Sequence, residues 1–163
     1  MPAQPAPDTA DRSLAHWSED GRREMEAFYA LARLDYRLLA EAVDWAGLLA
    51  RLTAERTAPL TLLDVACGSG KFPNALLTGA ALESESTVEY DLLDPSAFSL
   101  QEAAAELAPP FRERARFETT LEALDPGAGP WDVVWATHAL YALEPANIPA
   151  AVERFRAAIA PGG

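Results

Sequence analysis

The most distinctive feature of the chain is an acidic residue placed just before a run of small residues. Residues 62–70 read LLDVACGSG, so an apolar stretch that carries Asp64 ends in a turn with glycine at positions 68 and 70. A strand, a glycine turn and a following helix place free backbone N–H groups and the positive end of the helix beside the carboxyl end of the strand. Asp64 adds a fixed hydrogen-bond acceptor close to the same turn. The pattern predicts a site for a nucleoside-type ligand that carries a hydrogen-bond donor or a positive charge.

The elements that must position this turn alternate along the chain. Apolar residues at three- and four-residue spacing predict one bent helix or two helices over about residues 22–55, with a break near residues 44–47. Strands are predicted over residues 60–66, 87–92, 115–119 and 131–136, and helices over about residues 72–81, 100–107 (capped by Ser99) and 145–160. Alternating strands and helices predict an α/β fold with a mostly parallel sheet and helices on both faces.

The same pattern divides the chain into three parts. Residues 1–12 are rich in Pro, Ala and Asp and are predicted to be a disordered tail, residues 13–58 a helical cover, and residues 59–163 the α/β domain. The fourth strand is apolar on both faces, as an interior parallel strand should be, and the chain stops one helix later. We therefore expect a fragment that lacks its C-terminal strands, with possible self-association through the edge of the fourth strand.

Composition narrows the classes of partner. The 163 residues suffice for one core, and 13 basic against 25 acidic side chains give a formal net charge of −12, which disfavours DNA and RNA. Arg112, Arg114 and Arg116 form the densest basic cluster and are expected in a solvated loop before a strand. No apolar run approaches the roughly 20 residues that span a bilayer, and the first residues lack signal-peptide features, so a cytoplasmic location is expected.

The single cysteine limits the redox and metal chemistry of the chain. Cys67 excludes an intrachain disulfide and any multi-cysteine metal site, and no metal site is predicted. Nothing near it in the sequence favours a reactive thiolate, so Cys67 is expected to line the glycine turn as a small apolar residue.

Together these segments resemble the class I S-adenosylmethionine-dependent methyltransferases over residues 60–163. The first motif of that family is an acidic residue followed by small residues with Gly-x-Gly, which DVACGSG at residues 64–70 matches closely. YDLLDPS at residues 90–96 resembles the second motif, whose acid binds the ribose hydroxyls; Asp94 is the better candidate and Asp91 the alternative. WDVVWATHALY at residues 131–141 resembles the fourth motif. The resemblance implies a Rossmann-like fold and S-adenosyl-L-methionine as cofactor.

The resemblance also implies a set of site residues. Many family members contact adenine with an acidic residue after the third strand, where this chain offers Thr120 or Glu122 instead. His138 is a candidate general base, with loop orientation or ligand lining as its alternative roles, and His138, Tyr141 and Tyr29 are candidates to line the acceptor site. The candidate cofactor-binding residues are Asp64, Ala66, Cys67, Gly68, Ser69, Gly70, Asp94, Pro95, Thr120, Leu121, Ala136 and Thr137.

The aromatic residues of the N-terminal helices have two interpretations. Trp17, Phe28, Tyr29 and Tyr36 either cover the pocket as a lid that selects a small substrate or pack as core against the sheet. Helical periodicity favours packing against the sheet.

The predicted function is transfer of the methyl group of S-adenosylmethionine to an oxygen or nitrogen of a small-molecule acceptor. The sulfonium already makes the methyl carbon electrophilic, so the protein mainly aligns donor and acceptor. One alternative is a non-catalytic module that only binds the cofactor, because later strands of the family help to build the acceptor site. The other is an NAD-dependent oxidoreductase, but its Gly-x-Gly-x-x-Gly fingerprint requires glycine where this chain has Pro73.

Overall fold

The chain folds around a parallel sheet. The computed structural model describes residues 19–54, 56–79 and 87–161, so the predicted tail over residues 1–12 lies outside the described part. Within that part, four strands form one sheet in the order β3-β2-β1-β4, and every neighbouring pair is parallel. The strands are β1 (Leu60–Val65), β2 (Val88–Asp94), β3 (Phe111–Glu118) and β4 (Val133–Trp135). The strand order reverses between β1 and β4, which is where open α/β sheets bind ligands.

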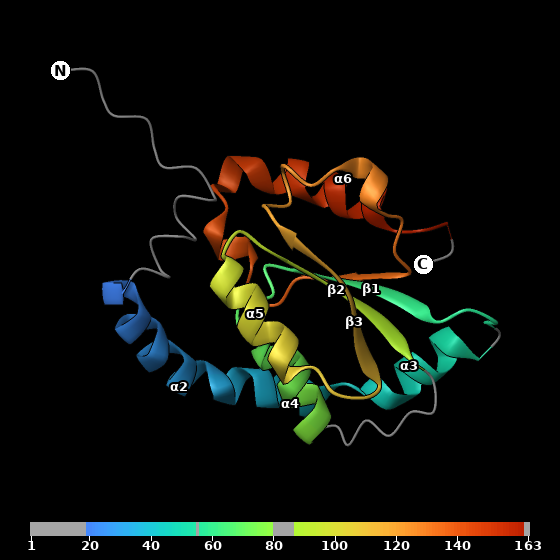
Figure 1. Cartoon of the computed structure of the whole chain (residues 1–163), viewed down its shortest axis with the longest axis horizontal. Helices are drawn as coiled ribbons and strands as arrows, with labels where there is room; N and C mark the ends of the chain where they lie inside the picture. Colours follow the sequence, from blue (N-terminus) through green and yellow to red (C-terminus); the bar gives the residue numbers. More distant parts are fainter. Residues whose placement is uncertain (1–18, 55, 80–86, 162–163) are drawn as a thin grey trace.

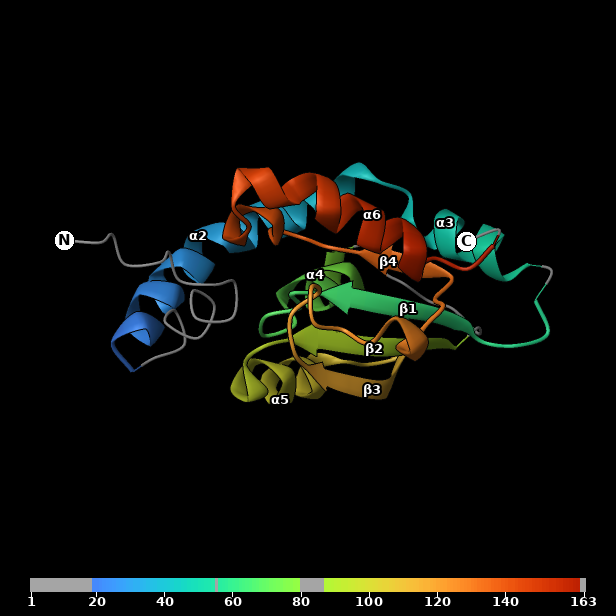
Figure 2. The same cartoon turned by 90° about the horizontal axis from the view of Figure 1, so that it is seen from above.

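Helices cover both faces of this sheet, as the sequence predicts. Figure 1 shows the strands between α6 on one side and α3 and α4 on the other, and Figure 2 shows the same arrangement from above. The helices are α2 (Glu19–Ala42), α3 (Trp45–Thr53), α4 (Lys71–Gly79), α5 (Ala97–Glu106) and α6 (Ile148–Ala158), with short 3-10 helices η1 (Pro126–Ala128), η2 (Leu140–Ala142) and η3 (Pro145–Asn147). None of the helices in the described ranges is long and apolar enough to cross a membrane.

The core has two halves because β1 and β2 are buried on both faces. Leu62 and Tyr90 belong to the half that packs against α2, α3, α4 and α5. Leu63 and Leu93, which point to the opposite face, belong to the half that packs against α6. Near-continuous apolar runs are typical of parallel strands that are covered on both sides. This arrangement confirms the predicted α/β, Rossmann-like class.

The break between the first two helices and the start of α5 are set by caps. Asp44 caps α3, and its carboxylate accepts a hydrogen bond from the backbone N–H of Gly47 at 2.8 Å. The prediction that Ser99 caps the next helix is wrong. Ser96 is the cap and accepts from the N–H of Ser99 at 3.2 Å, so α5 begins at Ala97. Ser99 itself is completely buried inside the first turn.

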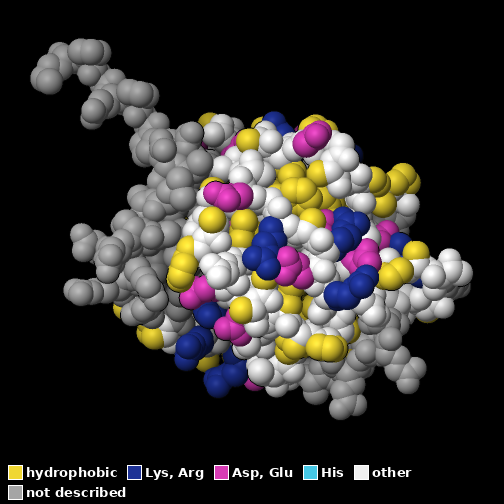
Figure 3. Space-filling view, viewed as in Figure 1, with side chains coloured by type: hydrophobic (Ala, Val, Ile, Leu, Met, Phe, Trp, Pro, Cys, Tyr) yellow, Lys and Arg dark blue, Asp and Glu magenta, His cyan; other side chains and the backbone are white. Residues whose placement is uncertain are grey.

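The prediction of a loop for the arginine cluster is also wrong, because β3 already begins at Phe111. Arg112 and Arg114 lie inside this edge strand, whose outer face is exposed and therefore carries charges that hid it from an apolar-pattern search. Each arginine pairs with an acid: Arg112 with Glu89 at 2.6 Å, Arg114 with Asp91, and Arg116 with Glu113 at 2.6 Å. Figure 3 shows basic and acidic side chains interspersed over this region rather than a basic patch.

β4 is shorter than predicted, and its outer edge is partly covered. Trp131 precedes the strand and forms a parallel bridge with Ile159 after α6. The N–H of Trp131 donates to the carbonyl of Ala158 at 2.8 Å, and the N–H of Ala160 donates to the carbonyl of Trp131 at 2.7 Å. Residues 145–147, expected as the start of the last helix, form the separate turn η3. Self-association through the β4 edge stays a prediction.

Candidate functional site

The carboxyl ends of the strands meet at one edge of the sheet, and the glycine turn lies there. After β1 the chain passes through left-handed backbone at Ala66 (φ 54°), Gly68 (φ 51°) and Gly70 (φ 72°) before α4 begins. The N–H of Cys67 donates to the carbonyl of Leu93 at 3.1 Å, which ties the turn to the end of β2. Left-handed backbone is free for glycine but strained for alanine, and such strain gathers at functional sites. The strained backbone of the turn therefore points to a functional role at this edge of the sheet.

Gly70 fits its position only because it lacks a side chain. An added Cβ would lie 2.8 Å from the Cα and 3.1 Å from the carbonyl oxygen of Ala103 in α5, on a backbone with φ +72°. We expect Gly70→Ala to lower the free energy of unfolding by about 1–3 kcal/mol, measured by urea denaturation. Gly79→Ala is the matched control, because its Cβ would meet only the Cβ of Ala40 at 3.6 Å. An equal loss of stability in both variants would contradict this account of the turn.

Asp64 presents a buried carboxylate next to the turn. Its side chain is 1% exposed, and its Oδ2 accepts a hydrogen bond from the Tyr90 hydroxyl at 2.7 Å. Oδ1 is buried without a hydrogen-bond partner among the described residues, and so is the indole nitrogen of Trp135. Burial raises the pKa of Asp64 to about 7, a rise that the Tyr90 hydroxyl and the nearby Trp135 indole oppose and the Asp94 charge increases. Asp64 thus keeps an acceptor atom without a formed hydrogen bond close to the turn, with the Trp135 indole N–H as a neighbouring donor.

Asp94 links the end of β2 to the same turn. The side chain is 3% exposed, and its carboxylate accepts hydrogen bonds from the N–H of Gly68 at 3.1 Å and from the N–H of Ser96 at 2.9 Å. Burial raises the pKa of Asp94 to about 6, although both backbone donors favour the charged form. Each carboxylate oxygen has a second lone pair, so both oxygens keep the capacity to accept from a ligand.

Asp91, the alternative to Asp94, lies away from this turn. It is fully buried, and its Oδ1 accepts from Arg114 Nε at 2.9 Å. Its Oδ2 accepts from the Trp131 indole N–H at 2.6 Å and from the other end of the Arg114 fork. Asp91 therefore holds the sheet together, and Asp94 is the carboxylate at the strand edge.

Several of the predicted cofactor residues line one small cavity. This cavity of about 60 Å³ brings together Ala66, Pro95, Thr120 and Leu121, which lie at the ends of β1, β2 and β3. Glu122, the alternative to Thr120, lines it as well. These residues follow three different strands and are far apart in the sequence, and the fold makes them neighbours.

Sequence reasoning missed the far wall of this cavity. Ala139, Leu140, Ala142 and Leu143, in and around η2, complete the lining together with Phe155 of α6. The fourth-motif residues 138–141 are the only sequence signal for this wall, and the motif favours the acceptor side for them. Ala136, predicted to contact the cofactor, packs against the core half under α6, and Thr137 is half-buried.

His138 and Tyr141 follow β4 and have different surroundings. His138 has left-handed backbone (φ 52°), and its ring packs edge-to-face against Tyr36 of α2 with centroids 4.9 Å apart. Tyr141 is 65% exposed, and its pKa is raised by its partial burial and by the Asp94 carboxylate. The side chain of Tyr29 lies outside the described part of the structure, and so do those of Trp17 and Phe28.

Cys67 and Ser69 are the two residues of the turn with polar side-chain atoms. Burial raises the pKa of the Cys67 thiol well above its usual value, so the group is not a thiolate at neutral pH. The Ser69 hydroxyl is buried and has no hydrogen-bond partner among the residues that the structure describes. In those same residues, no group of three or more His, Cys, Asp or Glu side chains is placed to hold a metal ion.

Comparisons with known proteins place this geometry in a family. A family model described as a methyltransferase domain matches residues 63–163. No curated protein sequence matches the chain. Among solved structures, the plantazolicin methyltransferase BpumL in complex with SAH is 17% identical with a TM-score of 0.59, and the alignment covers 93% of this chain and 55% of that one.

Two further structures have the same fold. The magnesium protoporphyrin IX methyltransferase ChlM from Synechocystis PCC 6803 with bound SAM is 16% identical, with a TM-score of 0.66 over 96% of this chain and 74% of that one. An amino pentose methyltransferase from Micromonospora echinaspora, also SAM-bound, is 26% identical, with a TM-score of 0.54 over 84% and 53%. The chain thus spans about half the length of several structures that it resembles. With a family model matched over residues 63–163, the chain belongs to the methyltransferase-domain family, as its motifs predict.

Proposed function

We propose that the chain binds S-adenosyl-L-methionine at the strand edge and serves the transfer of its methyl group to a small molecule. The observation that carries this proposal is the buried Asp64 carboxylate, whose Oδ1 has no partner among the described residues and lies beside a turn of left-handed backbone. An unpaired buried acceptor is costly, and a ligand that donates to it recovers that cost. The α-amino group of S-adenosylmethionine is such a donor.

The other residues of the edge fit the rest of the cofactor. Asp94, held by the N–H groups of Gly68 and Ser96, would accept from the two ribose hydroxyls. The apolar cavity at Pro95, Thr120 and Leu121 would take part of the adenine ring. The solved relatives crystallised with SAM or SAH support this choice of ligand over NAD.

In methyl transfer from S-adenosylmethionine, the main task of the protein is to align the donor methyl group with the acceptor atom. When bound, the cofactor supplies an electrophilic methyl carbon on its sulfonium. His138 would remove a proton from an oxygen or nitrogen acceptor that has to lose one, and the edge-to-face contact with Tyr36 would fix its ring. Tyr141 and Tyr29 would line the acceptor side. Neighbours that are named as methyltransferases of plantazolicin, magnesium protoporphyrin IX and an amino pentose support a small-molecule acceptor.

A module that binds the cofactor without turnover is the second candidate. The cofactor residues named above all lie within residues 64–137, so binding would not depend on further strands. A cytoplasmic location is part of both proposals.

Calorimetry with S-adenosylhomocysteine and NAD tests the proposal. We expect S-adenosylhomocysteine to bind and NAD not to bind. Because a hydrogen bond to a charged group contributes about 1.5–3 kcal/mol, Asp64→Ala and Asp94→Ala should each weaken binding by about 10- to 150-fold. Asp125→Ala is the control, since Asp125 only caps the exposed turn η1. Binding of NAD alone, or unchanged binding in both site variants, would overturn the assignment.

A further inference from the structure

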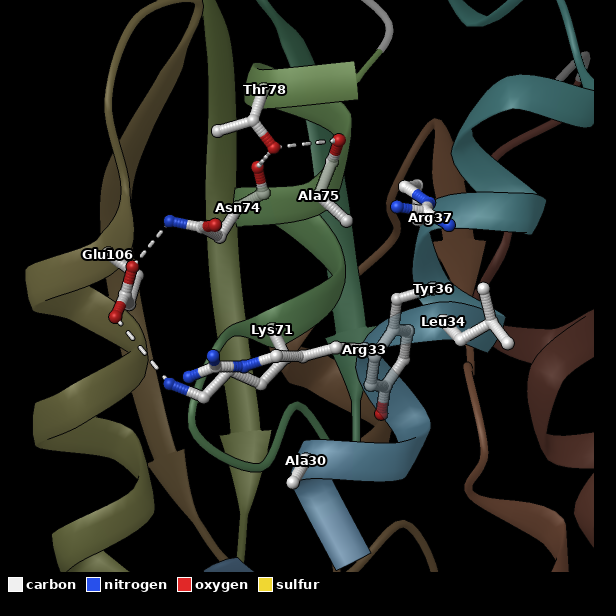
Figure 4. A pocket seen from close by; sticks show the side chains of 10 residues that line it. All are labelled: Ala30, Arg33, Leu34, Tyr36, Arg37, Lys71, Asn74, Ala75, Thr78 and Glu106. Carbon is white, nitrogen blue, oxygen red and sulfur yellow. Dashed lines mark hydrogen bonds and ion pairs between the residues drawn. The ribbon is translucent and has the colours of Figure 1, made fainter.

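A second cavity lies in the groove between α2 and α4. It has a volume of about 650 Å³, which is within the range of small-molecule sites. Figure 4 shows α2 on one side, with Arg33 and Arg37, and α4 on the other, with Lys71, Asn74 and Thr78. Glu106 at the end of α5 closes one side of the groove.

The charge of this groove is opposite to that of the whole chain. The chain carries a net charge of −12, and Lys71 is its only lysine, yet three cations and one carboxylate line the groove among the side chains that the structure describes. In Figure 3, Lys and Arg side chains gather over α2 at the lower left of the molecule. A local positive cavity on an acidic protein concentrates small anions, whereas the overall field repels polyanions.

The single carboxylate does not neutralise these cations. Glu106 accepts a hydrogen bond from the Asn74 amide at 2.6 Å and contacts the Lys71 ammonium only at 3.6 Å. Arg37 has only a long contact of 3.8 Å with Glu41 in the described part of the chain, and both side chains are more than half exposed.

Arg33 adds a further positive charge to the groove. Among the residues whose side chains the structure describes, it forms no ion pair, and in Figure 4 its guanidinium extends across α4 toward Lys71 and Glu106. A planar guanidinium next to an ammonium is the donor set that suits a carboxylate or phosphate oxygen pair.

We propose that the groove between α2 and α4 binds the carboxylate or phosphate group of a small molecule through Arg33 and Lys71. Asn74 and Thr78 add polar atoms to the floor, and Ala30, Leu34 and Ala75 supply apolar wall for the rest of the ligand. The groove shares no lining residue with the small cavity at Pro95 and Leu121, although Lys71 directly follows Gly70 of the glycine turn. In the proposal the groove is a site of its own beside the cofactor pocket.

The only lysine makes the test direct. Protein labelled with ¹³C and ¹⁵N in lysine alone reports the Lys71 side chain as a single set of NMR signals, and inorganic phosphate serves as the probe. We expect a saturable shift of the Lys71 signals with phosphate, and none with sodium chloride at equal ionic strength. Succinate is the second probe; tighter binding of one of the two assigns the anion class.

Three variants fix the site. Arg33→Gln should weaken phosphate binding at least about tenfold, because a charge-assisted pair is lost. Glu106→Gln should strengthen it, because the competing carboxylate is removed. Arg51→Gln, an exposed position on α3, is the matched control and should leave it unchanged.

Two results would overturn the proposal. One is a Lys71 signal that shifts no more with phosphate than with chloride. An equal phosphate shift in wild type and in folded Arg33→Gln would count in the same way. The other is loss of phosphate binding when S-adenosylhomocysteine saturates the strand-edge site, which would merge the two sites. The proposal expects phosphate to bind with or without S-adenosylhomocysteine. A protein that binds phosphate but not S-adenosylhomocysteine would therefore contradict the proposed function and leave the anion site standing.

Discussion

Replacing Asp91 with alanine is expected to lower the free energy of unfolding by about 3–5 kcal/mol, because it breaks a buried ionic network by removing one partner. Asp91 is 0% exposed and accepts from Arg114 of the edge strand β3 and from the indole of Trp131, which is 1% exposed. Without the carboxylate the Trp131 N–H stays buried and unpaired, and Arg114 loses its bidentate partner. Since small domains have only about 5–15 kcal/mol of stability, the variant should be close to unfolding at 37 °C.

Urea denaturation of two matched variants isolates the network. Asp91→Asn keeps an acceptor in place and should lose less, about 1–3 kcal/mol. Asp125→Ala removes a carboxylate from an exposed turn and should change the stability by less than about 1 kcal/mol. A loss below about 1 kcal/mol for Asp91→Ala would show that the three side chains do not stabilise the fold as a unit.

The sequence predicted the elements whose residues carry a strong local signal. β1 and β2 are apolar on both faces, and the glycine turn between β1 and α4 has a motif of its own, so these were located closely. β3 was located poorly, because an edge strand that exposes Arg112, Glu113 and Arg114 shows no apolar pattern. Two of its arginines pair with acids of the neighbouring strand β2, Arg112 with Glu89 and Arg114 with Asp91.

The candidate site also could be predicted from the sequence only in part. Asp64 and Asp94 could be named from their motifs, because each stands at a strand end next to a turn. The group that hydrogen-bonds Asp64 could not be named, since Tyr90 is 26 residues away in the sequence. The same holds for the structural carboxylate Asp91, which is 40 residues from its partner Trp131. Only strand register brings such pairs together. The wall of the cavity at η2 and the groove under α2 depend likewise on how helices pack, which sequence periodicity does not specify.

The second large effect that we expect is on the pH dependence of cofactor binding, and it involves Tyr90 and Asp64. The folded-state pKa of Asp64 is about 7, and a cofactor amino group is bound by its ionised form. A protonated Asp64 must release its proton before it accepts that group, so affinity should rise with pH and level off above about pH 7. Between pH 8 and pH 6, Asp64 alone should weaken the binding of S-adenosylhomocysteine by about tenfold.

Removing the Tyr90 hydroxyl should move this transition. Tyr90→Phe deletes the 2.7 Å hydrogen bond that favours the ionised carboxylate, so the pKa of Asp64 rises further. A hydrogen bond to a charged group contributes about 1.5–3 kcal/mol, which corresponds to an upward shift of about one to two pH units. Calorimetry from pH 5.5 to 9 measures the shift, and ¹³C NMR of the Asp64 carboxyl measures the same pKa without cofactor.

The double variant separates this effect from simple loss of packing. In an Asp64→Asn background the transition near pH 7 should be absent, and only the weaker dependence from Asp94, whose pKa is about 6, should remain. Tyr90→Phe should then shift nothing, because it acts through the Asp64 charge. If Tyr90→Phe lowers affinity equally at every pH, or does so in the Asp64→Asn background as well, the hydroxyl supports the core around Trp135 and does not tune the carboxylate. A shifted midpoint in the single variant alone would assign Tyr90 as the residue that positions and ionises Asp64 for the cofactor.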